Sequence, residues 1–409
     1  MRRLITVLLL AATLTGCVSQ TVKTTSVPPL AQTSGTVPEA ELLDVGVALL
    51  NPGIDNLDEL DDDEIVYPEV RRAEASFMAR ELAAVLTEQG AWGAVRVVPN
   101  EQQFTDLLAT GRILHSDGER LELAIQVRDA RGVLWIDKTY EAVTSQYAYR
   151  ARSPLKGDPF LALYREVAND MLRVFQSLAP KDRIAIRRVA ELEFARSFSP
   201  EAFDDYLTVD EDGVVSLQRL PAENDPMLER VREIRQRNYV FVDTLQGFYD
   251  GFSEDMYTPY QEWRKLSYEE IVALRELKRE STAQMIAGGA AIIAGIAARG
   301  SGNDYAGAAG MVGILSGGYL LKSGLEKRAE SNIHELAIEE IGQSLEAEIT
   351  PRVIELEDRT VRLSGNVEDQ YDQWRELLAD IYAAEIGALT PEMRIEVAPE
   401  NAAETAPAN

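Results

Sequence analysis

A few residues in this 409-residue chain have types and spacings that could do chemistry. Ser153 and Lys156 stand three positions apart, a spacing at which a lysine on a helix can activate a serine hydroxyl for acyl transfer. Pro154 falls where that helix would have to run, and no companion motif follows. The sequence therefore argues against acyl transfer at this position. We expect no enzymatic activity, and a periplasmic hydrolase is the third-ranked alternative.

Metal ligands are scarce and scattered. The two histidines, His115 and His334, are far apart in the sequence, and the single cysteine, Cys17, is near neither. Residues 55–64 carry seven carboxylates in ten positions, but they lack the ligand spacing and the central glycine of a calcium loop. Residues 300–302 read Gly-Ser-Gly without the Gly-Lys-Ser/Thr that a phosphate loop requires. We expect neither a metal nor a cofactor.

The N-terminus has the features of an export signal. Arg2 and Arg3 precede a short apolar core over 4–14, which is typical of a secretory signal and too short for a membrane span. A chain with one cysteine cannot form an internal disulfide, so the exported protein folds without one. The sequence therefore predicts a signal peptide over 1–16.

The end of this signal resembles the lipobox of bacterial lipoproteins. Leu14, Thr15 and Gly16 stand immediately before Cys17. The resemblance implies cleavage before Cys17, which becomes the first mature residue and carries acyl chains such as palmitate. No aspartate follows the cysteine, and by the same resemblance this favours the outer membrane, with the protein facing the periplasm.

Composition limits the possible partners. The formal net charge is -27 at pH 7. So acidic a chain is repelled by nucleic acids and by anionic lipid surfaces, so neither is an expected ligand. Residues 17–41 are rich in Ser, Thr, Pro and Gln, which predicts a flexible tether, and 398–409 predict a disordered tail.

The stretch over 42–180 predicts an α/β domain of mixed sheet and helices. The expected strands cover 42–53, 95–99, 111–116, 120–130 and 133–143, and the expected helices cover 67–89, 101–109 and 159–178. Gly90 is the expected stop of the first helix, and 116–118 and 130–132 are the expected hairpin turns. LELAIQV, residues 121–127, alternates strictly, which suits a sheet with one face covered by helices.

This order of elements, with its ATGRIL and RDARGVLWIDKTYE segments, resembles the α/β domain of periplasmic lipoproteins of the CsgG, LpoB and TolB N-terminal type. The resemblance lies in pattern and turns, and it includes no catalytic motif. It implies action through protein contacts, such as scaffolding or activation of other envelope proteins.

The region over 181–350 predicts mostly helices. We expect a helix over 181–197, a small hairpin around Asp212 and Gly213, and a helical segment beginning near Pro226 and interrupted at Gly247, Gly251 and Pro259. Its aromatic residues between 239 and 263 are expected to form core between long helices.

Two apolar runs over 285–321 predict a long antiparallel, glycine-zipper-like helical hairpin. Small residues recur at every fourth position, which allows two helix backbones to approach closely. They are Ala287, Ala291 and Gly295 in the first run and Ala309, Gly313 and Gly317 in the second. Close packing within protein, with self-assembly as its use, is the favoured interpretation. Insertion into a bilayer stays open, although a span needs about 20 apolar residues and the first run is shorter.

Residues 351–397 predict a β-hairpin turning at 357–358 and a helix over 368–386. VRLSGNVEDQ resembles the central strand and turn of a BON-type envelope module, and the strand pair could alternatively join the sheet of the first domain. The fold class expected overall is α+β. The expected function is a lipid-anchored envelope assembly factor that binds other envelope proteins or itself; the alternative is a membrane-inserting or pore-type oligomer.

Overall fold

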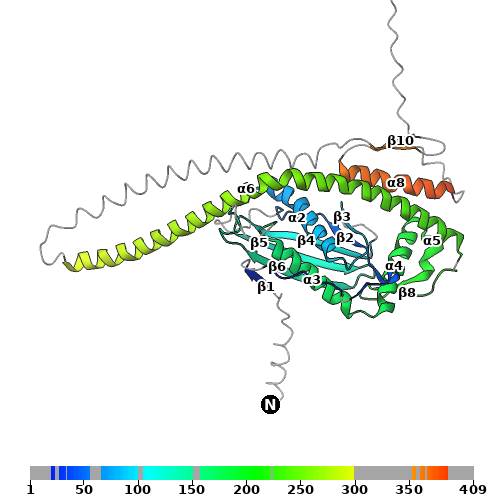
Figure 1. Cartoon of the computed structure of the whole chain (residues 1–409), viewed down its shortest axis with the longest axis horizontal. Coiled ribbons are helices and arrows are strands. Elements are labelled where there is room, and N and C mark those ends of the chain that lie inside the picture. Colours follow the sequence, from blue (N-terminus) through cyan, green and yellow to red (C-terminus); the bar gives the residue numbers. More distant parts are fainter. Residues whose placement is uncertain are drawn as a thin grey trace, which may run out of the picture.

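The computed structural model describes residues 20–23, 27–33, 35–55, 66–99, 105–150, 157–222, 224–298, 352–355, 360–363 and 366–385. A six-stranded mixed sheet forms its centre, in the order β1-β6-β5-β4-β2-β3 (Figure 1). The strands are β1 (Gln20–Lys23), β2 (Val45–Ala48), β3 (Val95–Val98), β4 (Leu107–Ser116), β5 (Arg120–Asp129) and β6 (Leu134–Val143). A mixed sheet with helices, followed by mostly helical regions, confirms the α+β fold class.

Strand β2 pairs in parallel with β3 and β4, whereas β4, β5 and β6 form an antiparallel meander. The alternation of β5 has the predicted effect, because Leu121, Leu123, Ile125 and Val127 are all buried on one face. Helices α2 (Pro68–Gln89) and α3 (Leu161–Ser177) cover that face. Gly90 ends α2 in the left-handed conformation with φ of 65°, as predicted.

One predicted helix of this domain is wrong. Residues 107–109, expected to end a helix over 101–109, are the start of strand β4. Leu107 and Ala109 face the core, and their backbone pairs with β2 on one side and β5 on the other. Burial and two-sided strand pairing outweigh the weak helical pattern of the segment.

The segment expected to be a flexible tether is bound to the folded body at several of its described residues. Its strand β1 pairs in parallel with β6 at the edge of the sheet. Farther on, the side-chain oxygen of Asn169 in α3 accepts the Ala31 N–H at 2.8 Å, and Glu41 forms an ion pair with Arg183 at 2.9 Å. These partners are more than 130 residues away in the chain, so composition alone gives no sign of them.

The helical region begins with α4 (Pro180–Phe198), α5 (Pro200–Phe203) and the predicted hairpin of β7 (Leu207–Val209) and β8 (Val215–Leu217). Helix α6 (Pro226–Ala298) follows, and Asp225 caps it by accepting the N–H groups of Met227 and Leu228. The 73 residues of α6 correspond to a length of roughly 110 Å. In Figure 1 it runs along the body and extends well beyond the sheet.

The predicted interruptions of α6 are wrong, because the helix continues through Gly247, Gly251 and Pro259. A methyl group added at either glycine would meet open space, so these residues lie away from close packing. Proline removes one helical hydrogen bond, but residues around it are held by tertiary contacts: Met256, Tyr260 and Trp263 are all buried.

The chain ends, as far as it is described, in the predicted hairpin and helix: β9 (Arg352–Glu355), β10 (Thr360–Leu363) and α8 (Val367–Glu385). The hairpin is a separate two-stranded sheet and does not join the central one. Helix α8 packs on α6 through stacked rings of Phe241 and Trp374, 4.8 Å apart. The predicted aromatic core is confirmed for most of its members, and buried residues of the sheet, α4, α6 and α8 form one hydrophobic cluster.

Candidate functional site: the junction of α6 with the sheet

A buried ion pair joins α6 to the segment that precedes α3. Arg264 donates from Nη1 to Oδ2 of Asp158 at 2.6 Å, and both side chains are 0% exposed. The guanidinium lies 3.9 Å from the centre of the Tyr260 ring and 4.8 Å from that of Phe160. Burial disfavours its charge, but Asp158 and neighbouring tyrosines raise the pKa of Arg264 well above its usual value. The pair is therefore ionic and sealed from water.

Glu74 of α2 forms a second contact in the same interior. Its carboxylate accepts hydrogen bonds from Ser116 of β4 at 2.6 Å and from the hydroxyl of Tyr260 on α6. Arg71, one turn earlier, lies 3.8 Å from the other carboxylate oxygen. One buried carboxylate thus links α2, the sheet and α6.

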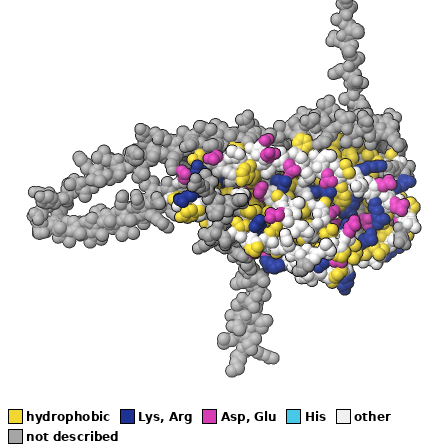
Figure 2. Space-filling view, in the orientation of Figure 1, with side chains coloured by type: hydrophobic (Ala, Val, Ile, Leu, Met, Phe, Trp, Pro, Cys, Tyr) yellow, Lys and Arg dark blue, Asp and Glu magenta, His cyan; other side chains and the backbone are white. Residues whose placement is uncertain are grey.

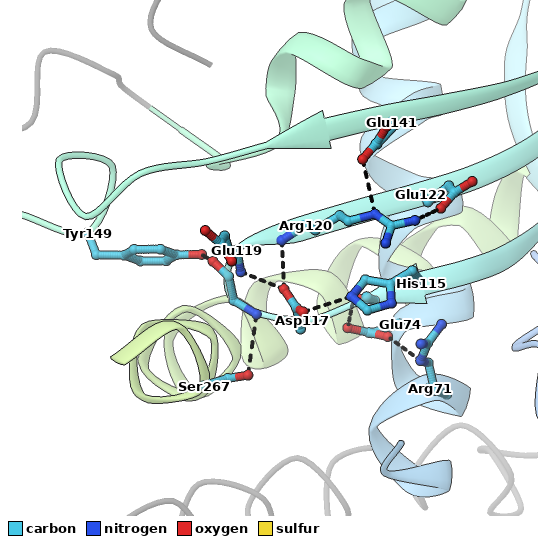
Figure 3. A network of polar contacts seen from close by, with 12 residues as sticks. Arg71, Glu74, His115, Asp117, Glu119, Arg120, Glu122, Glu141, Tyr149 and Ser267 are labelled. Carbon is cyan, nitrogen blue, oxygen red and sulfur yellow. Dashed lines mark hydrogen bonds and ion pairs between the residues drawn. The ribbon is translucent and has the colours of Figure 1, made fainter. Parts of the chain in front are cut away.

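The turn between β4 and β5 packs directly against α6, as Figure 3 shows. The Gly118 N–H donates to the Ser267 hydroxyl at 3.3 Å, and Tyr149 donates to the Gly118 carbonyl. A methyl group at Gly118 would lie 1.9 Å from the Arg264 carbonyl oxygen, so the contact requires glycine.

Asp117 fixes the shape of this turn. Its side chain accepts the N–H groups of Glu119 and Arg120, both at 2.6 Å, and its other oxygen lies 2.7 Å from Nε2 of His115 (Figure 3). Burial raises the pKa of Asp117, but these hydrogen bonds outweigh it and lower the pKa below its usual value. The carboxylate is ionised and serves the turn, and His115 belongs to this packing arrangement.

A second group of contacts attaches α6 to β3, the strand at one edge of the sheet. The side-chain amide of Gln246 accepts the Val97 N–H and donates to the Val97 carbonyl, both at 2.9 Å. Arg96 forms a two-bond ion pair with Asp243, and its guanidinium lies 4.8 Å from the centre of the Tyr239 ring. Together with the buried ion pair, these contacts define what we call the α6 clamp: Glu74, Gly118, Asp158, Gln246 and Arg264.

Glu81 of α2 lies beside the clamp and titrates near neutrality. Burial, together with the charge of Asp158, raises the pKa of Glu81 to about 7, although Arg264 and Arg80 lower it. In the unfolded chain the carboxyl ionises near its ordinary pKa of 4.5. The folded protein therefore favours the protonated form of Glu81. The stabilisation from this group is complete below about pH 4.5 and is lost as the pH rises through about 7.

We expect Glu81→Gln to raise the free energy of unfolding by about 1–2 kcal/mol at pH 8 and to change it little at pH 4.5, because the amide cannot ionise. Urea denaturation at the two pH values measures this difference. Glu88→Gln, at an exposed position of the same helix, is the matched control. An equal effect of Glu81→Gln at both pH values would contradict the prediction.

Two surface depressions flank α6. One of about 270 Å³ lies between the end of α2 and α6, next to Arg96 and Asp243, and one of about 450 Å³ lies next to Glu191 and Arg232. In both, the charged groups are ion pairs with each other. These ion pairs join neighbouring elements, Arg96 of β3 with Asp243 of α6 and Glu191 of α4 with Arg232 of α6.

Only some of the residues that the sequence singled out are among the described residues. Ala287, Ala291 and Gly295 fall within α6, one helical turn apart. The other predicted positions lie outside the described residues. They are the lipobox with its cysteine (Leu14, Thr15, Gly16 and Cys17), the second stripe of small residues (Ala309, Gly313 and Gly317), and Ser153, Lys156 and His334. Most of the acidic loop also lies outside them; its Asp55 is described and forms an ion pair with Arg112.

Within the described part of the chain, no three acidic, histidine or cysteine side chains gather in a way that could hold a metal ion. Across the same residues, no helix combines the length and the apolar character that a membrane span requires.

Sequence reasoning missed the α6 clamp. One signal was present, since Glu74 interrupts the apolar face of α2 formed by Val70, Ala73 and Phe77. Comparison of the chain with protein-family models, with curated proteins and with solved structures finds no match.

Proposed function

We propose that this protein is a lipid-anchored envelope protein that acts as an assembly or scaffold factor through protein contacts. Acylated Cys17 would hold it in the outer membrane, facing the periplasm. The observation that carries the proposal is α6, a long continuous helix clamped to the sheet at one end and extending beyond it at the other (Figure 1).

The clamp makes α6 suitable for such a role. The clamp contacts reach Ser267, and the helix continues for 31 further residues, or roughly 47 Å; we call residues 268–298 the arm. A helix fixed at its base holds its far part in a defined direction, which reduces the entropy lost when a partner binds. On the face that Figure 2 shows, acidic, basic and apolar side chains of the body are interspersed. The arm is therefore the feature that we assign to partner binding.

The charged groups of the described interior support a structural role. The charged groups that come together there, such as Arg264, Asp158 and Glu74, are used to bind elements of the fold to one another. Arg264 and Asp158 are bonded to each other and fully buried, and the rings of Tyr260 and Phe160 pack against the guanidinium.

The second candidate is a membrane-inserting or pore-type oligomer. It is favoured by the continuity of α6 through the small residues Ala287, Ala291 and Gly295, which gives the stripe the helical spacing that close self-association uses.

Carbonate extraction of membranes from cells that express Cys17→Ser distinguishes the two candidates. We expect the variant to be processed differently from the wild type and released into the soluble fraction, because the acyl chains supply the attachment. Retention of the variant in the membrane would instead favour insertion of the hairpin. Normal processing with unchanged membrane association would refute the anchor.

The scaffold role itself is tested by a photo-crosslinking amino acid at Gln284 on the arm, with Val240 on the clamped part of α6 as the matched control. Val240 is 55% exposed, so it samples neighbours without belonging to the core. We expect crosslinks to another envelope protein or to a second copy from Gln284 and few from Val240. The same crosslinks from both positions would argue against the arm as the binding element.

A further inference from the structure

The N-terminal strand β1 occupies the edge of the sheet opposite the edge held by α6. The strand order places β1 beside β6 and β3 at the far side, with five strand spacings between them, or roughly 24 Å. Gln20 pairs with Tyr140 and Lys23 with Val143, so β1 covers only the second half of β6. Only Val18 and Ser19 separate Cys17 from this strand.

We propose that the β1–β6 edge of the sheet lies directly on the lipid surface, so that the membrane is a binding partner of the folded domain and fixes its orientation. This inference rests on the acylation of Cys17 proposed above. It goes beyond that anchor, because a lipid on a flexible tether would leave the domain free to tumble.

The residues after β1 support a short and fixed attachment. Asn169 of α3 donates to the Pro29 carbonyl at 3.2 Å, and Arg165 donates to that of Pro28. Gln89 at the end of α2 donates to the Ala31 carbonyl at 3.1 Å. Residues 28–31 are therefore held by α2 and α3, and residues 20–23 by strand pairing.

Chain geometry limits the distance between lipid and sheet. The three residue steps from Cys17 to Gln20 span at most roughly 10 Å even when they are fully extended. Because β1 and β6 are parallel, the N-terminal end of β1 points toward the first half of β6, where Leu134 is 41% exposed. The surface that faces the lipid is thus the start of β6 with the neighbouring side of α3.

The opposite edge is then directed away from the membrane. There Asp243 and Gln246 of α6 hold β3, so the clamped part of α6 lies on the membrane-distal side (Figure 1). This orientation presents that part of the protein to the periplasm.

The single native cysteine makes the orientation measurable, because acylation consumes its thiol. We would introduce Leu134→Cys at the predicted lipid-facing edge and, as the matched control, Val240→Cys, which lies on the clamped part of α6 and is 55% exposed. Each lipidated protein is labelled with an environment-sensitive fluorophore and reconstituted in phosphatidylcholine vesicles that carry a headgroup spin label. Fluorescence is then compared with and without the quencher.

We expect several-fold stronger quenching at position 134 than at position 240. Insertion of about twelve Gly and Ser residues between Ser19 and Gln20, a linker with a reach of roughly 20 Å, should reduce the quenching at position 134 to that at position 240. Equal quenching at the two positions in vesicle-bound protein would overturn the orientation and leave the anchor in place. Failure of the lipidated chain to float with the vesicles would refute the anchor, and the orientation with it.

Discussion

Replacing Arg264 with Met is expected to lower the free energy of unfolding by about 3–5 kcal/mol, because Asp158 would keep a buried charge without its partner. Both side chains are completely buried, so water cannot replace the lost contact. The loss should appear in urea denaturation followed by circular dichroism. Amide hydrogen exchange should also rise along α6 around Tyr260, since the ion pair is what joins this part of the helix to the segment before α3.

Two further variants separate charge from packing. The double variant Arg264→Met with Asp158→Asn should recover part of the loss, because it leaves no unpaired charge. Arg232→Met is the matched control on the same helix; its ion pair with Glu191 is partly exposed, and we expect a change of less than about 1 kcal/mol. If Arg264→Met also lowered the free energy of unfolding by less than about 1 kcal/mol, the buried pair would not be what holds α6.

The second large effect is expected for Gly118→Ala, which should lower the free energy of unfolding by about 2–3 kcal/mol. The added methyl group would lie 1.9 Å from the Arg264 carbonyl oxygen and 2.3 Å from the Tyr268 nitrogen. Backbone atoms of a helix cannot move aside as a flexible side chain does. The turn and α6 must therefore separate, and the bond between Gly118 and Ser267 should be lost.

Gly247→Ala provides a control of opposite sign. This glycine lies inside α6, and an added methyl group there meets open space. Alanine favours helix over glycine by about 0.5–1 kcal/mol, so this variant should be more stable than the wild type. Thermal and urea denaturation of the two variants measure both changes. A stable Gly118→Ala protein would mean that the turn does not rest against α6 in solution.

Local patterns in the sequence predicted much of the fold. The strict alternation of β5 gave its strand and its buried face, and the apolar spacing of α2 with Gly90 gave a helix and its end. Asp225 before Pro226 correctly marked the start of α6. In each case the residues that decide the structure are neighbours in the chain.

Prediction failed where distant residues decide the structure. Leu107 and Ala109 are strand residues because β2 and β5 flank them, and Pro259 stays within α6 because tertiary contacts hold the helix on both sides of it. The N-terminal segment is held by Asn169 and Arg183, whose approach no local pattern indicates. At such positions, tertiary packing outweighs the intrinsic helix or strand propensity of the residues.

The α6 clamp was missed for the same reason. Arg264 and Asp158 are separated by 106 positions, and Tyr260 and Glu74 by 186. Either charged residue, considered alone, is an ordinary surface type in a chain rich in charge. Only the fold brings them together inside the protein.

The Gln246 amide also has a consequence for aggregation. An uncovered edge strand is a template on which a second sheet can grow, and this is a common start of aggregation. By bonding to both backbone groups of Val97, the side chain occupies the position that a foreign strand would take. Helix α6, which carries this amide, thus also protects the sheet from uncontrolled polymerisation along its β3 edge.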